Sequence, residues 1–283
     1  MEIQMIQDIA PIQFYNEFLQ VKPSPGSVVF CFDDQTVYLK NQEEGKAAFP
    51  HFSQLDKKDQ DRVAFLFTID SQSYFICTRD LEGAISGFSF CPVRVLRDWK
   101  DKTFMFAGAT AYHLFTWYRS NRYCGHCGSE LKHDTKQRML LCTCCHNMVF
   151  PKIAPAVIVA VTDHDRILMT KYNGRSYQKY ALIAGFTEIG ETLEETVARE
   201  VMEEVGLRVK NIRYYKSQPW GFDSNLLTGF FAELDGNDKI TREEEELSEA
   251  DWFERNQMPI EDDGISLTRE MMRVFQNGKE WDF

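Results

Sequence analysis

Three glutamates lie close together in the last third of the sequence. Glu200, Glu203 and Glu204 stand at positions i, i+3 and i+4, so on a helix they share one face. Like charges this close repel each other, and a helix gains nothing from that arrangement alone. Clustered carboxylate oxygens are ligands that Mg²⁺ and Mn²⁺ prefer. The pattern predicts a divalent cation site that acts on a phosphate-containing substrate. The plainer alternative is a solvated acidic helix face.

The segment around these acids has the features of a helix with defined ends. Thr192 followed by Glu195 forms a capping box that starts a helix, and Gly206 suits the left-handed residue that ends one. Arg199 can pair with Glu191 and so hold the preceding loop to the helix. A stripe of apolar residues recurs at every fourth position for the core: Leu193, Val197, Val201 and Val205.

The whole segment, Gly185–Leu207, resembles the Nudix signature. That signature is Gly, five residues, Glu, seven residues, then Arg-Glu-apolar-x-Glu-Glu-x-Gly-apolar. The defined positions here are Gly185, Glu191, Arg199, Glu200, Val201, Glu203, Glu204, Gly206 and Leu207. The resemblance assigns metal binding and general-base catalysis to the three clustered glutamates, with Glu204 favoured as the most closely involved. Gly185, Glu191, Arg199 and Gly206 would be structural.

Five of the eight cysteines crowd into a short stretch before this segment. Cys124 and Cys127 form one C-x2-C pair, and Cys142 and Cys145 form a second. Two such pairs supply the four soft ligands that tetrahedral Zn²⁺ requires, and a site closed by four thiolates is structural. We expect one zinc ion per chain. Two disulfides are the alternative, and Cys144 is a possible competitor for a ligand position.

The remaining cysteines and the nearby histidines suggest no chemistry. Three single cysteines in apolar surroundings are expected to be buried and inert: Cys31, Cys77 and Cys91. Three histidines of the cysteine-rich stretch are expected to be ordinary surface residues: His126, His133 and His146.

The elements that position these residues fall into three stretches, and we expect an α+β protein. Residues 1–118 carry short apolar runs, predicted as strands at 27–32, 37–40, 63–69 and 74–78, and a helix near 106–120. Residues 119–152 form the zinc ribbon. Residues 153–283 carry a predicted strand hairpin at 155–163 and 166–172, a strand from Tyr180 that ends at Gly185 and the acidic helix, in a Nudix α/β/α sandwich with a mixed sheet.

Composition limits the protein class. The formal net charge is −11, which argues against a protein that coats nucleic acid, since that task needs a basic face. No apolar run is long enough for a membrane span, and the first residues lack the pattern of a secretory signal. We expect a cytoplasmic enzyme.

A loop beyond the box bears on the choice of substrate. SQPWGFDSN, residues 217–225, combines an amide with aromatic rings that can stack a base or a nicotinamide. A Pro-Trp turn buried for packing is the alternative. The residues expected to contact the substrate are Gln218, Pro219, Trp220, Gly221, Phe222, Asp223, Ser224 and Asn225.

A four-cysteine ribbon before a Nudix box, with SQPW after it, resembles the NudC-type NADH diphosphatase family over about residues 117–283. Family members cleave NAD(H) to nicotinamide mononucleotide and AMP, and some remove NAD caps from RNA. Their loop usually reads SQPWPFPxS. This chain has Gly221 and Asp223 at the proline positions and Asn225 at the serine position. Its preference among dinucleotides therefore stays open.

The resemblance implies further site residues. The backbone of Ala184 and a downstream glutamate would join the three box glutamates around Mg²⁺ or Mn²⁺. That glutamate aligns as Glu246, or as Glu245 after a one-residue slip. Phe186 would stack the adenine. Phe150, where a tyrosine is more usual, would reach the pocket of the partner subunit in a homodimer.

Three alternatives remain at this stage. Similar boxes occur in enzymes for ADP-ribose, nucleotide sugars and diadenosine compounds. A non-catalytic nucleotide-binding module is a second alternative, although such a module is expected to lack part of the carboxylate set. For capped RNA, the basic residues nearest to a binding lane are Lys132, Lys136, Arg138 and Lys152, which are equally well explained as plain surface charges.

Overall fold

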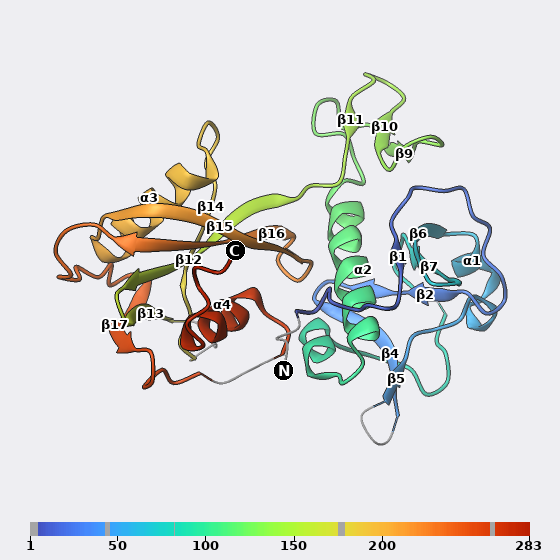
Figure 1. Cartoon of the computed structure of the whole chain (residues 1–283). Coiled ribbons are helices and arrows are strands. Elements are labelled where there is room, and N and C mark those ends of the chain that lie inside the picture. The colour runs from blue at the N-terminus through green and yellow to red at the C-terminus, as the bar shows by residue number, and fades with distance from the viewer. Residues whose placement is uncertain (1–4, 43–45, 82, 175–178, 261–263) are drawn as a thin grey trace. The chain divides into compact units, whose positions relative to one another are not determined.

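The computed structural model of the chain describes residues 5–42, 46–81, 83–174, 179–260 and 264–283. These residues form two compact units (Figure 1). The first, here called the Nudix unit, comprises the N-terminal segment up to Gln7, Ile153–Trp220 and Asn225–Phe283. The second, the ribbon unit, comprises Asp8–Lys152 and Gly221–Ser224. The three-part division expected from the sequence stays a prediction, since the contacts group the ribbon with the N-terminal stretch.

A six-stranded mixed sheet forms the centre of the Nudix unit. Its order is β15-β16-β12-β13-β17, and β14 pairs with β12 beside that path. The β12–β16 pair is parallel and the others are antiparallel, so the expected mixed sheet is confirmed. The strands are β12 Ala154–Asp163, β13 Arg166–Tyr172, β14 Ile183–Phe186, β15 Val209–Trp220, β16 Asn225–Leu234 and β17 Leu247–Glu254.

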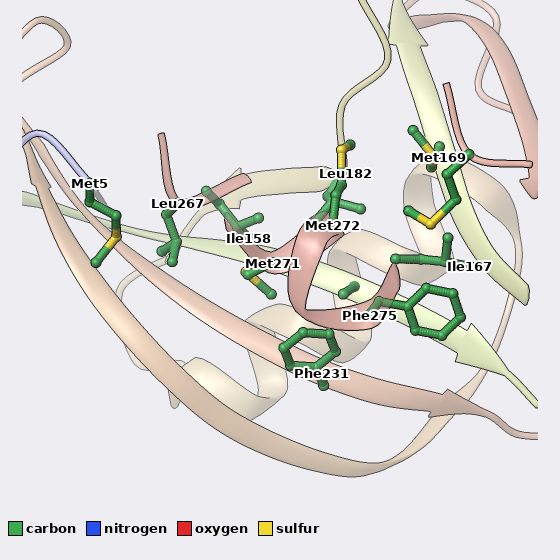
Figure 2. Packing of buried hydrophobic residues seen from close by; sticks show 12 residues of the cluster. Met5, Ile158, Ile167, Met169, Leu182, Phe231, Leu267, Met271, Met272 and Phe275 are labelled. Atoms are coloured by element: carbon green, nitrogen blue, oxygen red, sulfur yellow. The ribbon is translucent and has the colours of Figure 1, made fainter. Parts of the chain in front are cut away.

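One helix covers each face of this sheet. Alternate residues of β12 point to opposite faces, so Val157 and Val159 pack with α3 (Leu193–Val205), whereas Ile158 and Ala160 pack with α4 (Leu267–Gln276). Figure 2 shows the α4 side, where Met271, Met272 and Phe275 meet Ile158 and Phe231. The predicted α/β/α sandwich is confirmed.

The ribbon unit contains one long helix and, beside the small sheet of its cysteine-rich stretch, two further small sheets. One sheet has the order β1-β6-β7-β2, and in the other β3-β4-β5 is joined by β8, which pairs with β4. The strands are β1 Phe14–Tyr15, β2 Val28–Phe30, β3 Phe32–Asp33, β4 Thr36–Gln42, β5 Lys46–Ala48, β6 Val63–Ile69, β7 Gln72–Cys77 and β8 Ser89–Pro92. The helices are α1 Lys57–Gln60, α2 Lys102–Ser120 and two 3₁₀ turns, Phe52–Gln54 and Val93–Asp98.

Helix α2 begins earlier than the sequence pattern suggested. Asp101 is its N-cap and accepts a hydrogen bond from the backbone N–H of Phe104 at 3.1 Å, so the helix runs from Lys102 rather than from about 106.

The burial of the single cysteines differs in part from the expectation. Cys31 and Cys77 are buried as expected, but Cys91 is only half-buried, because β8 contributes few residues to the core.

The cysteine-rich stretch forms a three-stranded sheet of order β11-β10-β9, with β9 Leu131–His133, β10 Leu140–Cys142 and β11 Met148–Val149. Within the described ranges, no helix combines the length and apolar character needed to cross a membrane. The expected α+β class with a Nudix sandwich and a cysteine cluster is confirmed.

Candidate active site

Helix α3 carries the acidic residues, and local sequence explains both of its ends. The Thr192 hydroxyl accepts from the backbone N–H of Glu195 at 3.2 Å, and the Glu195 carboxylate accepts from the backbone N–H of Thr192 at 2.8 Å. Gly206 ends the helix in the left-handed conformation with a φ of 69°. The capping box and the C-cap are thus confirmed.

The glycine that opens the box is required by a close approach. A Cβ atom built on Gly185 would lie 1.9 Å from the carboxyl carbon of Glu200, which no packed structure tolerates. The Glu200 side chain therefore occupies the space where a residue other than glycine would place its side chain. This contact sets one carboxylate of α3 against the backbone of β14, beside Ala184.

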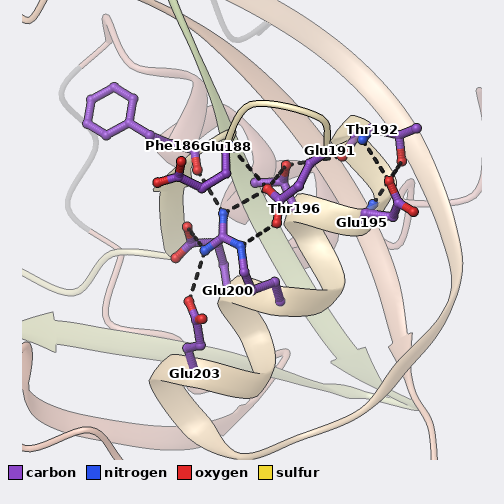
Figure 3. Close-up of polar contacts among 9 residues, drawn as sticks. Phe186, Glu188, Glu191, Thr192, Glu195, Thr196, Glu200 and Glu203 are labelled. Atoms are coloured by element: carbon purple, nitrogen blue, oxygen red, sulfur yellow. Dashed lines mark hydrogen bonds and ion pairs between the residues drawn. The ribbon is translucent and has the colours of Figure 1, made fainter.

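Arg199 is the centre of a polar network that joins the loop before α3 to the helix (Figure 3). Its guanidinium donates to Glu191 at 2.6 and 3.0 Å and to the backbone carbonyl of Phe186 at 2.9 Å. It also donates to Glu200 at 2.7 Å and to Glu203 at 2.9 Å. The predicted Arg199–Glu191 pair is confirmed. The arginine also screens the repulsion between the two carboxylates of α3.

The three box glutamates differ in exposure. Glu200 and Glu204 are buried, whereas Glu203 is exposed. Burial raises the pKa of Glu200, Arg199 lowers it, and the negative charges of Glu203 and Glu246 raise it further. Glu246 is therefore within electrostatic reach of Glu200. The structure brings this downstream glutamate to the box, although 46 positions separate the two residues.

Backbone hydrogen bonds hold the segment that contains Glu246. The N–H of Glu243 donates to the carbonyl of Glu204 at 2.8 Å, and the N–H of Asn173 donates to the carbonyl of Glu246 at 2.7 Å. The segment thus runs from the last turn of α3 to the end of β13. The Ala184 carbonyl and the four carboxylates are all oxygen donors, the type that Mg²⁺ and Mn²⁺ prefer. Among the described residues, however, only the four cysteines lie close enough together to form a ligand cluster as they stand.

A second group of predicted residues lies on the opposite face of the sheet. Paired residues of neighbouring strands point to the same face, and β12 pairs Ala156 with Phe186 and Ala154 with Asn225. Asn225 is also paired with Trp220 of β15. Because Ala154 and Ala156 alternate in step with Ile158, this is the face covered by α4. Phe186 is largely exposed, whereas Trp220 and Asn225 are buried.

Gln218 lies on the same face but is fully buried, and its amide is used within the fold. Its Nε2 donates to the carbonyl of Ile265 at 2.8 Å and to Oε1 of Gln7 at 3.1 Å. Its Oε1 accepts from the backbone N–H of Leu267 at 2.8 Å, at the first turn of α4. The side chain therefore holds the start of α4 and the N-terminal segment in place. Sequence reasoning expected a substrate contact here and had no signal for these distant partners.

The rest of the predicted loop belongs to the ribbon unit. A Cβ atom on Gly221 would lie 2.1 Å from the carbonyl oxygen of Ala109 in α2, so glycine is required there for packing. The guanidinium of Arg97 lies 6.0 Å from the ring centroid of Phe222. Asp223 is exposed, and Ser224 has a φ of 56°. Pro219, in the Nudix unit, and Phe150, in the ribbon unit, are both exposed.

The four cysteines of the two pairs meet as predicted. All four Sγ atoms lie within 4.8 Å of one another, with Cys124 and Cys145 at 3.6 Å and Cys127 and Cys142 at 3.4 Å. Sulfurs of a tetrahedral Zn²⁺ site with bonds of about 2.3 Å are separated by about 3.8 Å. Hydrogen bonds from Ser129 lower the pKa of Cys127 to about 6, which favours its thiolate. The structure has these cysteines as free thiols, and Cys144 is exposed outside the group.

Sequence reasoning missed one residue of the box. The Thr196 hydroxyl donates to the Glu191 carboxylate at 2.9 Å and is fully buried beneath it. Thr196 stands four residues after the N-cap Thr192, so it faces the start of the helix and the loop that carries Glu191; this spacing was the available signal.

Comparisons with known proteins agree with this geometry. Residues 152–275 match the model of the NUDIX domain. The chain is 42% identical over 168 residues to the NAD-capped RNA hydrolases NudC of Escherichia fergusonii and Escherichia coli K12, which covers 59% of this chain and 65% of each relative. The match thus spans slightly less than two thirds of the length of these relatives.

Among solved structures, a NUDIX hydrolase from Nitrosomonas europaea is 25% identical with a TM-score of 0.48, over 55% of this chain and 91% of that chain. The family model, the complete box and the sandwich around it lead to one conclusion. The chain carries a Nudix domain over residues 152–275 and is related to the NudC-type Nudix hydrolases.

Proposed function

We propose that this protein hydrolyses the diphosphate bond of NAD(H), yielding nicotinamide mononucleotide and AMP. The observation that carries the proposal is the arrangement around β14. Gly185 faces the carboxylates of α3, and the next residue, Phe186, points to the opposite face of the sheet, the face that also carries Trp220 and Asn225 on the far side of β12. A dinucleotide that stacks a ring on Phe186 can reach the carboxylates by passing the edge of β14. The names of the relatives support the same substrate class.

The cation site in this proposal consists of the Ala184 carbonyl, Glu200, Glu203, Glu204 and Glu246. Bound Mg²⁺ or Mn²⁺ would neutralise the diphosphate and lower the pKa of a water molecule. Glu204 is the preferred general base. Arg199 holds the carboxylates of Glu200 and Glu203 in position, and Glu246 completes the set of oxygen ligands.

The ribbon is proposed to hold one structural Zn²⁺. Cys142→Ser should remove the metal from the purified protein, because three thiolates bind zinc far more weakly than four. Cys144→Ser is the matched control, since Cys144 is two residues away and outside the cluster. Metal analysis should find one zinc per chain in the control and much less in Cys142→Ser. Equal zinc in both variants would contradict the assignment.

Removal of NAD caps from RNA is included in the proposal, on the strength of the relatives' names. We further propose a cytoplasmic homodimer in which Phe150, exposed at the end of the ribbon sheet, contributes to the partner's pocket. Size-exclusion chromatography with light scattering, on the parent protein and Phe150→Ala, tests the dimer.

The deciding experiment is product analysis with NADH, NAD⁺, ADP-ribose and NAD-capped RNA, each with Mg²⁺ or Mn²⁺. Glu204→Gln should abolish product formation, whereas Glu194→Gln, an exposed glutamate on the same helix, should not. Nicotinamide mononucleotide and AMP as products support the proposal. Cleavage of ADP-ribose alone would favour another Nudix substrate. No cleavage by folded, zinc-loaded protein would favour a binding module.

A further inference from the structure

A cavity of about 330 Å³ lies within the ribbon unit, where the zinc ribbon meets the β1-β6-β7-β2 sheet. The segment Phe18–Val21, the start of β6, the end of α2 and the end of β9 line it. All of these residues belong to one compact unit. The cavity is therefore separate from the carboxylates of α3, which lie in the Nudix unit.

The walls of the cavity are held together by side chains that cross the junction. Arg138 of the ribbon donates to Oδ1 of Asn16 at 3.1 Å and to the carbonyl of Leu66 in β6. Gln20 donates to the carbonyl of Thr135 at 3.2 Å. The cavity is thus a built feature of the fold, shaped before any ligand arrives.

Two aromatic polar residues line the cavity. Tyr118 is 7% exposed, and its ring centroid lies 5.0 Å from that of His133. Among the described residues, nothing forms a hydrogen bond with the Tyr118 hydroxyl or with the His133 ring nitrogens. Although the Tyr118 ring is buried, its hydroxyl reaches the accessible surface of the cavity, so it is available to a ligand. Burial raises the pKa of Tyr118 to about 12, so it remains a hydrogen-bond donor at neutral pH.

The other walls mix apolar and polar side chains, and part of the apolar surface faces solvent. Leu19 and Val21 are 51% and 36% exposed, and Phe18 and Phe65 complete the lining nearby. Asp61, Arg62 and Asp134 also border the cavity, so charges of both signs lie at its rim and the carboxylates can accept from a ligand that carries N–H donors. A flat ring with N–H donors and acceptors at its edge matches aromatic walls and a neutral tyrosine–histidine pair.

We propose that this cavity binds a single nucleobase, with hydrogen bonds from the edge of the base to the Tyr118 hydroxyl and the His133 ring. The base can come from a free nucleoside or from one residue of a single-stranded RNA. Its recognition does not depend on the diphosphate chemistry of the Nudix unit. The site would give the protein a second point of contact with a nucleotide ligand.

The test uses the full zinc-loaded chain without added Mg²⁺ or Mn²⁺, so that no turnover occurs. Adenosine, guanosine, cytidine and uridine are titrated by calorimetry up to a few millimolar, and a 5′-hydroxyl oligoribonucleotide is titrated beside them. At least one nucleoside, or the oligonucleotide, should bind. Tyr118→Phe keeps the ring and should weaken that binding about three- to ten-fold, the effect of one lost hydrogen bond. His133→Ala should weaken it further.

Two control variants separate this site from others. Tyr15→Phe removes an exposed hydroxyl outside the cavity and should change nothing, and Phe186→Ala should leave this binding intact. If the oligonucleotide binds, and replacing one of its nucleotides by an abasic residue abolishes the binding, RNA is the source of the base. If nucleosides bind as tightly as the oligonucleotide, the free nucleoside is the source. The proposal is overturned if nothing binds, or if Phe186→Ala abolishes binding while the two cavity variants do not.

Discussion

The Nudix box and the loop that follows it are both rich in predicted site residues, but they are held in different ways. In the box, Arg199 and Thr196 each donate to Glu191 across at most eight positions, and the caps are made by residues three positions apart. In the loop, the Gln218 amide bonds to residues 211 positions before it and 49 positions after it. Gly221 packs on a helix more than a hundred positions away.

The difference shows where function can be read from local pattern. The contacts within the box join residues that are close in sequence, so the spacing of those residues predicts their geometry. The contacts of the loop join segments that are far apart in the sequence. Its residue types therefore suggest substrate contacts, whereas the Gln218 amide in fact stabilises the fold. If this contrast holds, changes in the box should affect chemistry, whereas changes in the loop should affect stability.

Gly185→Ala should produce the largest loss. The added Cβ would meet the Glu200 carboxylate and displace it from its place against β14. We expect NADH hydrolysis to fall by about 100-fold or more, since a shift of about 1 Å at a catalytic group has that effect. Gly26→Ala is the control, because no atom lies within 4 Å of its added Cβ. A folded Gly185→Ala variant with full activity would show that the close approach is unimportant.

Gln218→Ala should act on stability more than on chemistry. The change leaves the buried Leu267 N–H without the Gln218 oxygen and removes one of the hydrogen bonds to the Ile265 carbonyl, which also accepts from the Ile6 N–H; the free energy of unfolding should fall by about 1–3 kcal/mol. Denaturant unfolding measures the loss, with the exposed Gln257→Ala as control. If Gln218 instead contacts substrate, KM will rise while the free energy of unfolding stays unchanged.

Gly221→Ala should destabilise the ribbon unit by overpacking. The backbone of α2 at Ala109 cannot move as a side chain can, and we expect a loss of about 1–2 kcal/mol in the free energy of unfolding. The same reason applies to Gly221→Pro, which would restore the residue usual in the resembled family. A proline variant as stable as the parent protein, measured by thermal unfolding, would contradict this account of the glycine.

The smallest effect concerns pH. Hydrogen bonds from Arg199 lower the pKa of Glu191 to about 2, below its ordinary value near 4.5. A depressed pKa stabilises the folded state above pH 4.5, and that contribution is lost as the pH falls toward 2. The difference in melting temperature between the parent protein and Glu191→Gln should therefore be largest near pH 7 and shrink below pH 4.5. Glu194→Gln controls for the loss of one charge, and a constant difference across this range would refute the pairing argument.

Much of the fold was predictable because its signals are local. The strands at 63–69 and 166–172 were predicted at the bounds that the structure has for β6 and β13. The two cysteine pairs meet in one cluster as their spacing indicated. Helix α2 was predicted too short, because an N-cap aspartate followed by Lys-Thr-Phe-Met gives little periodicity. Cys91 was expected to be buried, because its apolar neighbours hid the shortness of β8.

By itself, the sequence determined the Nudix box, the helix that carries it and the cysteine cluster, since each depends on spacings within about twenty residues. The tertiary structure alone decided which residues share a face of the sheet, so that Gly185 meets Glu200 while its neighbour Phe186 points the other way. It also brought Glu246 within electrostatic reach of the box and gave Gln218 its partners. Strand pairing and burial join segments that are far apart in the chain, and no local pattern encodes which segments will meet.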